Sequence, residues 1–143
     1  MSVFVVDASV AIKWLLPSER EPLHAEALSW LDRHMNGEVK FVVPDLFWAE
    51  IGNFLWKSIR YARLTAAIAQ TALDELKGRG LEAVPCSSLV DAALEIAVAY
   101  QRSAYDSFYV ALALQTKTEL ITADEKLANA LATHLPVKWL GAL

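Results

Sequence analysis

Residues 3–12 of the chain read VFVVDASVAI, and this stretch sets the expectation for the fold. Its first four residues are all β-branched or aromatic, which is typical of a short strand buried on both faces. Asp7 follows directly and is the only charged residue among positions 1–12. We therefore predict a buried strand over residues 3–6 with a carboxylate at its carboxyl end, followed by a helix over residues 9–16 that Pro17 stops.

The alternation of short apolar runs with longer helical segments continues along the whole chain. Further strands are predicted at residues 41–43, 81–84, 120–122 and 137–140. Helices are predicted at residues 23–35, 46–61, 65–77, 89–100, 105–115 and 125–132, the segment 89–100 being apolar enough for a buried helix. Strands that alternate with helices in this way favour an α/β fold, with a parallel sheet covered on both faces.

Length and composition limit the class of protein. The 143 residues correspond to a single domain over residues 1–143, and a hydrophobic content of 55% argues against disorder. The longest apolar stretch contains Asp91 and Glu95, so no membrane span is expected. The first residues lack a basic region, and Cys86 is the single cysteine, so neither a signal peptide nor an internal disulfide is predicted and a cytoplasmic location is expected.

Four carboxylates stand in otherwise apolar surroundings. Asp7 and Asp124 follow predicted strands, whereas Glu50 and Asp106 fall in the first turns of predicted helices. Ligands of open α/β sheets bind at the carboxyl ends of the strands, and right-handed connections start the helices at that same edge. We therefore expect the four acids to meet in one cleft, where a cation from solvent would compensate their charge.

Each acid also has a purely structural interpretation. Residues 103–106 and 122–125 match capping-box patterns, so Asp106 and Asp124 can serve as favourable helix starts, and Asp7 can simply begin the first helix. Glu50 is the hardest to explain in this way, because it lies among large apolar side chains. The joint occurrence of all four favours a site.

Polar neighbours and ligand chemistry indicate which cation would suit such a site. Ser9, Asn53 and Thr122 lie two or three residues from the acids and can orient ligands or a bound water, although helix capping is an equally good explanation for the two hydroxyls. Oxygen ligands without nearby cysteine or histidine suit Mg²⁺ or Mn²⁺ and not zinc. We expect one or two such ions.

Four segments, in this order, resemble the PIN-domain family, and within it the VapC-type toxins of prokaryotic toxin–antitoxin pairs. They are residues 5–9 (VVDAS), residues 44–53 with Glu50 and Asn53, residues 105–113 (YDSFYVALA) and residues 120–127 (LITADEKL). No single motif is specific, but the set of four is, and it spans nearly the whole chain. All four acidic positions of the family are filled, by Asp7, Glu50, Asp106 and Asp124.

The resemblance implies a three-layer α/β/α sandwich around a twisted, mainly parallel sheet of four to five strands. It also implies an Mg²⁺- or Mn²⁺-dependent ribonuclease, a homodimer and a small antitoxin partner that blocks the site. On this hypothesis Asp7 and Asp106 are direct ligands, Glu50 and Asp124 complete the set, and either of the latter can accept the proton of the attacking water.

Basic residues bear on the substrate. A net charge of −4 argues against nucleic-acid binding by bulk charge, so RNA would need a local basic patch or bound ions. Lys57, Arg60 and Arg63, together with Lys13, can hold phosphates, and Tyr61 can stack on a base. An equally good interpretation is a solvated helix end with cations near its carboxyl terminus.

The apolar content exceeds what one sheet contact requires. Trp48, Phe54, Trp56 and Ile59 crowd the helix 46–61, and residues 66–69 begin the next helix with AAIA-type composition. We expect part of this surface to face a second subunit or a partner segment, the alternative being a large core.

Three rival functions remain open at this stage. A receiver-like signalling module would need an acidic pair after the first strand and a lysine near the last, a position that only Lys138 loosely fits. A metal-dependent phosphatase or DNA-directed nuclease would keep the fold and change the substrate, although a phosphoaspartyl phosphatase would want an aspartate where Ser9 stands. A PIN fold that serves only as a binding partner is the third.

Overall fold

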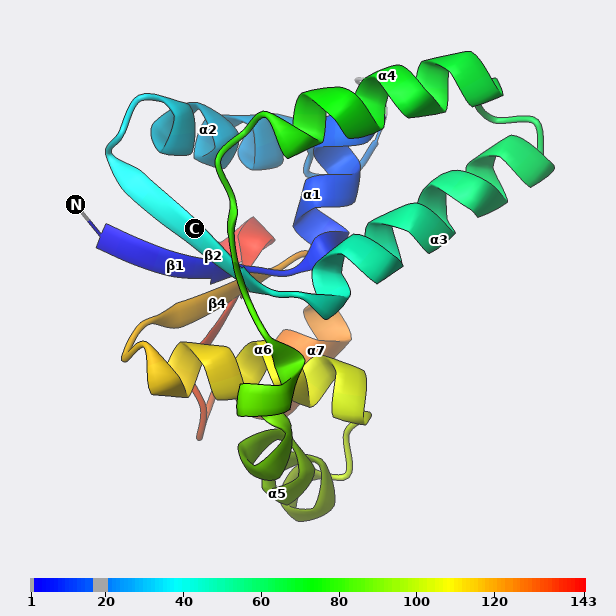
Figure 1. Ribbon diagram of the computed structural model, residues 1–143. Coiled ribbons are helices and arrows are strands. Elements are labelled where there is room, and N and C mark those ends of the chain that lie inside the picture. Colours follow the sequence, from blue (N-terminus) through cyan, green and yellow to red (C-terminus); the bar gives the residue numbers. More distant parts are fainter. Residues whose placement is uncertain (1, 17–20) are drawn as a thin grey trace.

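A single parallel sheet forms the centre of the computed structural model, which describes residues 2–16 and 21–143 (Figure 1). The strands are arranged in the order β3-β2-β1-β4-β5, and every neighbouring pair is parallel. The predicted mainly parallel sheet is therefore confirmed, with five strands. Their bounds are β1 Ser2–Val6, β2 Val39–Pro44, β3 Glu82–Val84, β4 Glu119–Thr122 and β5 Val137–Trp139.

Helices connect the strands and agree with the predicted segments to within two residues at each end. Pro17, which was predicted to stop the first helix, lies outside the described residues, and α1 ends at Leu15. Two short 3₁₀ turns, η1 Cys86–Ser88 and η2 Leu140–Ala142, were not predicted. The helices are α1 Ala8–Leu15, α2 His24–Met35, α3 Leu46–Arg60, α4 Ala66–Lys77, α5 Val90–Tyr100, α6 Ala104–Gln115 and α7 Glu125–Leu131.

The helices form two layers. Figure 1 shows α1 to α4 on one side of the sheet and α5 to α7 on the other, which confirms the three-layer α/β/α sandwich. Strand β1 lies in the middle of the sheet, and its residues Val5 and Val6 are fully buried. Its carboxyl end, where Asp7 follows, is therefore enclosed by elements of both layers.

The strand order bears on the receiver-like alternative. A receiver-like domain has the doubly wound order 2-1-3-4-5, whereas here β1 lies between β2 and β4. Lys138, the one lysine that loosely fitted that design, lies in β5 with its Nζ 3.6 Å from a carboxylate oxygen of Glu119. The strand order therefore does not favour the receiver-like alternative.

The prediction of a buried helix at residues 89–100 is wrong for one face of α5. Leu89, Ala93 and Ile96 are buried against α6 and the core, but Val90, Leu94 and Val98 are exposed. The helix forms the outer part of its layer and packs on α6 instead of the sheet, so only one side of it is covered. None of the described helices is long and apolar enough to cross a lipid bilayer.

Phe41 in β2 provides a test of the core on the α2 side of the sheet. Its ring is fully buried and stacks on Trp14 and on His34, with ring centroids 5.8 Å and 5.0 Å away. We expect Phe41→Ala to lower the free energy of unfolding by about 3–5 kcal/mol, because it removes a packed ring and leaves a cavity. The measurement is urea unfolding followed by circular dichroism.

The matched control is Val98→Ala on α5, where the side chain is 74% exposed. This change should alter the free energy of unfolding by less than about 0.5 kcal/mol. Equal losses in the two variants would contradict the assignment of Phe41 to the core.

Candidate active site

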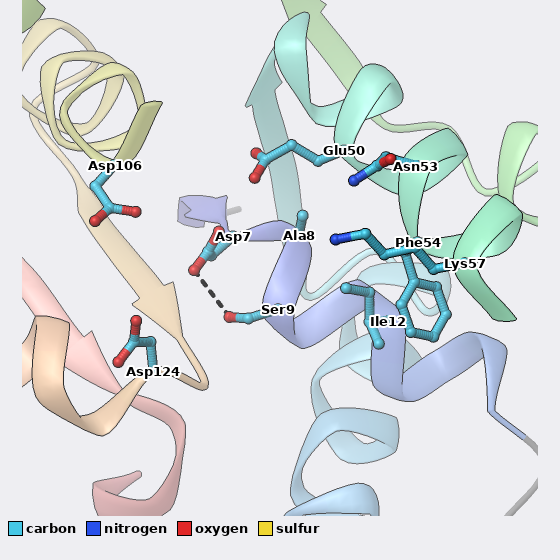
Figure 2. A pocket seen from close by; sticks show the side chains of 10 residues that line it. All are labelled: Asp7, Ala8, Ser9, Ile12, Glu50, Asn53, Phe54, Lys57, Asp106 and Asp124. Atoms are coloured by element: carbon cyan, nitrogen blue, oxygen red, sulfur yellow. Dashed lines mark hydrogen bonds between the residues drawn. The ribbon is translucent and has the colours of Figure 1, made fainter. Parts of the chain in front are cut away.

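The four predicted acids line one pocket at the carboxyl edge of the sheet (Figure 2). The pocket has a volume of about 340 Å³ and also contains Ser9, Asn53 and Lys57. Figure 2 shows Asp7 between Glu50 on one side and Asp106 and Asp124 on the other. Residues separated by more than a hundred positions in sequence are thus brought to one place. The remaining lining residues are Ala8, Ile12 and Phe54.

Parallel strands and their following helices explain how these acids meet. Asp7 follows β1 directly, and Asp124 comes two residues after the neighbouring strand β4. Asp106 lies in the first turn of α6, as predicted. Glu50 does not lie in the first turn of its helix, because α3 begins at Leu46 and places it in the second turn. Helical side chains tilt toward the amino terminus, so the Glu50 carboxylate still reaches the pocket.

Two hydroxyl groups hold the Asp7 carboxylate. Ser9 Oγ and Thr122 Oγ1 both donate to Asp7 Oδ2, at 2.8 Å and 2.7 Å. The hydroxyl oxygens in turn accept backbone N–H groups, from Ala123 to Ser9 and from Asp124 to Thr122, each at 3.0 Å. Each hydroxyl thus accepts one backbone N–H and donates its own hydrogen to Asp7. This network joins the ends of β1 and β4.

The capping interpretation holds for some of these residues and fails for others. Ser9 and Thr122 are not helix caps, because the N–H groups that their hydroxyls accept belong to Ala123 and Asp124, which precede the first turn of α7. Asp124 does cap α7, with Oδ1 accepting the Leu127 N–H at 3.1 Å, and Ser103 caps α6 by accepting the Asp106 N–H. Asp7 stands at the N-cap of α1 without a capping hydrogen bond from its side chain.

Burial and like charge raise the pKa of two of the carboxyl groups. Burial is the larger cause for Asp7, and the Asp106 charge adds to it, while the hydrogen bonds from Thr122 and Ser9 lower its pKa. Burial likewise raises the pKa of Glu50, followed by the charges of Asp7 and Asp106, and the Tyr109 hydroxyl opposes them. The site thus holds mutually repelling carboxylates that a cation would stabilise.

Positive side chains compensate only part of this charge. Arg102, which no sequence pattern linked to the site, lies one turn before Asp106 with its Nη2 3.4 Å from Oδ2. Among the described residues, no basic side chain forms an ion pair with Asp7, Glu50 or Asp124. Lys57 lines the pocket on the α3 side, as Figure 2 shows.

The four basic residues predicted to hold RNA differ in their surroundings. Lys57 lies in the pocket, but Lys13 is buried and its Nζ is 3.1 Å from a carboxylate oxygen of Glu21. Arg60 lies over the Trp56 ring, 5.3 Å from its centroid, and Arg63 is exposed beyond the end of α3. Lys57 is therefore the one of the four that the pocket itself presents.

Each of the four carboxylates has one oxygen engaged by the protein. Oδ2 of Asp7, Oε1 of Glu50, Oδ2 of Asp106 and Oδ1 of Asp124 are held by Ser9 and Thr122, Tyr109, Arg102 and the Leu127 N–H. No side-chain or capping hydrogen bond from the described residues reaches the other oxygen of each. The site thus offers single oxygens from several directions.

These oxygens surround the pocket without gathering at one point. Within residues 2–16 and 21–143, no three acidic, histidine or cysteine side chains are close enough together to hold an ion by themselves. Mg²⁺ commonly keeps several waters and binds through one or two carboxylates. All the donors of this site are oxygens, and basic side chains compensate only part of their negative charge. The site therefore fits an ion that is held partly through water.

Sequence reasoning missed Tyr109. Its hydroxyl donates to Glu50 Oε1 at 2.6 Å, although the residue itself belongs to the buried core of α6. The residue lies three positions after Asp106 and thus on the same helix face. That spacing is the one signal in the sequence that could have drawn attention to it.

The comparisons with known proteins agree with this geometry. The model of the PIN domain family matches residues 4–131. The chain is 30% identical over 127 residues to Ribonuclease VapC3 of Pyrobaculum aerophilum, covering 87% of this chain and 92% of the relative. It is 31% identical over 137 residues to Ribonuclease VapC9 of Mycobacterium tuberculosis, covering 94% and 96%.

Solved structures share the fold. The protein PAE2754 from Pyrobaculum aerophilum superposes with a TM-score of 0.71 and 22% identity, covering 99% of this chain and 85% of that one. VapBC2 from Rickettsia felis, determined bound to a DNA fragment from its promoter, gives a TM-score of 0.70 and 14% identity, covering 96% and 98%. At sequence identities of 22% and 14%, the similarity to these structures establishes the fold alone.

The raised pKa of Asp7 predicts how its charge affects stability in the absence of metal. Because the folded protein binds the proton more tightly than the unfolded chain does, ionisation of Asp7 costs stability as the pH rises above the unfolded pKa, near pH 4. In EDTA, Asp7→Asn should therefore be more stable than the natural protein at neutral pH, and the difference should narrow toward about pH 4.

Urea unfolding at several pH values measures this difference. The control is Asp91→Asn, since Asp91 is exposed on α5, and this change should show no such trend. A natural protein more stable than Asp7→Asn at neutral pH in EDTA would contradict the prediction.

Proposed function

This chain belongs to the PIN domain family, and on that premise we propose that it is a divalent-metal-dependent endoribonuclease, the toxin of a toxin–antitoxin pair. The observation that carries the proposal is the convergence of Asp7, Glu50, Asp106 and Asp124 on one pocket at the carboxyl edge of the sheet. Relatives named as VapC ribonucleases, at least 30% identical over most of the chain, support the ribonuclease assignment. We place the activity in the cytoplasm, where RNA is available.

Mg²⁺ or Mn²⁺, as one or two ions, is the cofactor that we propose for this pocket. The free oxygens of Asp7 and Asp106 would bind it most directly, with Glu50 and Asp124 completing the set directly or through water. When bound, such an ion makes a coordinated water more acidic and offsets charge on the phosphoryl oxygens. The pKa values of Asp7 and Glu50, which burial raises, support this choice, because a nearby cation would favour their charged forms.

The chain's own residues then have distinct tasks in hydrolysis of the phosphodiester bond. Ser9 and Thr122 hold Asp7 in one orientation through their hydrogen bonds to Oδ2. Glu50 or Asp124 accepts the proton of the attacking water through its unengaged oxygen. Lys57 binds a phosphate of the RNA, and Asn53, which lines the same pocket, donates to a substrate oxygen or to a bound water.

RNA binding beyond the pocket is assigned to the carboxyl end of α3. Arg60 and Arg63 are exposed there, and the exposed ring of Tyr61 can stack on a base. Bound divalent ions would add to the positive charge that the acidic chain presents to phosphates. Lys13 has no part in this proposal, because its ammonium group is buried beside Glu21.

Two exposed apolar surfaces support the proposed protein partners, a second copy of the chain and a small antitoxin. Trp48 and Phe54 pack against the chain's own core, so that part of the predicted surplus is internal. Trp56 and Ile59 on α3 and Ile68 on α4 remain exposed, as does the row on α5. That row consists of Val90, Leu94 and Val98. Several solved relatives of the same fold are toxin–antitoxin complexes, which supports the antitoxin.

The nuclease proposal predicts a specific dependence on metal and on Asp7. The purified chain, free of partners, should cleave single-stranded RNA with Mg²⁺ or Mn²⁺ and lose this activity in EDTA. Asp7→Asn should reduce the rate by about 100-fold or more, because the substitution removes a charged oxygen from the metal site. Fluorescence of a labelled RNA follows the reaction.

Asp91→Asn is the matched control and should cleave at the natural rate, since Asp91 is exposed on α5 and does not line the pocket. Single-stranded DNA and a phosphomonoester serve as alternative substrates. Cleavage that survives in EDTA or in Asp7→Asn would refute the assignment, and a preference for DNA or for the phosphomonoester would favour the rival enzyme classes.

The homodimer is tested separately from catalysis. Sedimentation at micromolar protein concentration should give twice the mass of the chain, because burial of the exposed apolar rows favours association. A monomer under these conditions would remove the dimer from the proposal and leave the nuclease assignment intact.

A further inference from the structure

Tyr109 connects the buried core to the pocket. The residue is only 2% exposed, and its hydroxyl donates to Glu50 Oε1 at 2.6 Å. Burial first, and then the charges of Asp7 and Glu50, raise the pKa of the phenol, so the group keeps its proton and acts as the donor. A hydrogen bond of this length to a carboxylate is of the strong, charge-assisted kind.

This hydrogen bond crosses between the two helical layers. Helix α3 packs mainly on α1 and α4, whereas α6 packs on α5 and on the strands β1, β2 and β4. In the described part of the chain, the Tyr109–Glu50 contact is the one side-chain hydrogen bond that joins α3 to α6. The end of a flexible glutamate side chain is thus anchored from the opposite layer.

The same helix also carries Asp106. Asp106 and Tyr109 lie three residues apart on α6, so they share a face of the helix. One rigid element therefore supplies a carboxylate to the pocket and the hydroxyl that anchors a second carboxylate. The position of Glu50 relative to Asp106 is set by this arrangement.

The contact also selects which oxygen of Glu50 is available. Of the described residues, Tyr109 is the one whose side chain donates to this carboxylate, and it occupies Oε1. Oε2 is left for a cation, its water shell or the attacking water. The pattern resembles that of Asp7, where the hydroxyls of Ser9 and Thr122 both donate to the same oxygen, Oδ2.

We propose that Tyr109 is a positioning residue for the proposed nuclease: its hydroxyl holds Oε1 of Glu50 so that Oε2 is presented to a divalent cation in the pocket. The proposal rests on the proposed function. Tyr109 acts through Glu50 and does not touch the RNA. A hydroxyl that holds the carboxylate oxygen not bound to the metal would affect the metal affinity as well as the rate of RNA cleavage.

The competing explanation is that the ring fills the core and the hydroxyl is merely satisfied by the nearest acceptor. Tyr109→Phe separates the two, since it keeps the ring and removes only the donor. Tyr100→Phe is the matched control, because it makes the same chemical change on α5, where the Tyr100 ring lies against His134 and outside the pocket.

The first experiment measures Mn²⁺ affinity by electron paramagnetic resonance, without RNA. We expect Tyr109→Phe to bind Mn²⁺ about 10- to 100-fold more weakly than the natural protein, which is the usual effect of losing a group that orients a metal ligand. Tyr100→Phe should bind as the natural protein does. In a Glu50→Gln background, Tyr109→Phe should weaken binding no further, because the carboxylate through which it acts is already gone.

The second experiment separates turnover from substrate binding. At the Mn²⁺ concentration that gives the natural protein half of its maximal activity, Tyr109→Phe should lower kcat for RNA cleavage and leave KM for RNA nearly unchanged. A higher Mn²⁺ concentration should restore part of the rate. If Tyr109→Phe lowered the rate only by disturbing the packing of the core, a higher Mn²⁺ concentration would not restore it.

A third measurement needs no variant and so does not depend on how Tyr109→Phe folds. The hydroxyl proton of Tyr109 should give a slowly exchanging NMR resonance that shifts when Mg²⁺ is added, because its acceptor is then drawn toward the cation. Tyr109→Phe assigns the resonance if that variant folds, and nuclear Overhauser contacts to the Tyr109 ring assign it otherwise.

Three results would overturn the positioning role. They are an unchanged Mn²⁺ affinity in Tyr109→Phe, additive effects of Tyr109→Phe and Glu50→Gln on Mn²⁺ affinity, and a Tyr109 hydroxyl resonance whose chemical shift does not change in saturating Mg²⁺. Failure of the proposed function has a different signature, in which the natural protein neither binds Mn²⁺ nor cleaves RNA. Binding of Mn²⁺ and cleavage by the natural protein, with any of the three results above, would retain the nuclease and reject the role of Tyr109.

Discussion

The carboxylate of Asp7, recessed at the end of the central strand, is the constraint on which the rest of the site depends. An acid in this place is costly, and the chain lowers that cost with two hydroxyl donors instead of a basic partner. Both donors are themselves fixed by backbone N–H groups that follow β4. The pairing of β1 with β4 and the orientation of Asp7 are therefore one structural feature, and a shift in that strand pairing would disturb the site.

Around Asp7 the chain places further negative charge that it does not fully neutralise. Burial and like charge raise the pKa values of Asp7 and Glu50, and Arg102 approaches only Asp106. If these acids had only a structural role, side-chain donors to both oxygens of each carboxylate would be expected, whereas the second oxygens have none among the described residues. The arrangement supports the proposal that a cation completes the site, with Tyr109 holding one oxygen of Glu50, Ser9 and Thr122 one oxygen of Asp7, and Arg102 one oxygen of Asp106.

Wrong predictions came from features that depend on neighbours in space. The helix at residues 89–100 has the composition of a buried helix, yet α5 packs mainly on α6 and leaves Leu94 and Val98 exposed. Lys13 belongs to a predicted basic patch, yet the fold buries it beside Glu21. Glu50 was assigned to a first helical turn and lies in the second. For α5 and Lys13 the partner that decided the outcome lay elsewhere in the chain, whereas a helix that begins at residue 46, as predicted, already places Glu50 in its second turn.

The sequence by itself determined the order and type of the elements, the parallel α/β class and the four acidic positions, because apolar periodicity and isolated charges are local signals. Tertiary structure alone decided the strand order, the hydroxyl network around Asp7 and the contact between Tyr109 and Glu50, which joins residues 59 positions apart. The physical reason is that a hydrogen bond depends on distance and direction between atoms, and nothing in a linear chain specifies these until the sheet and its two helical layers are packed.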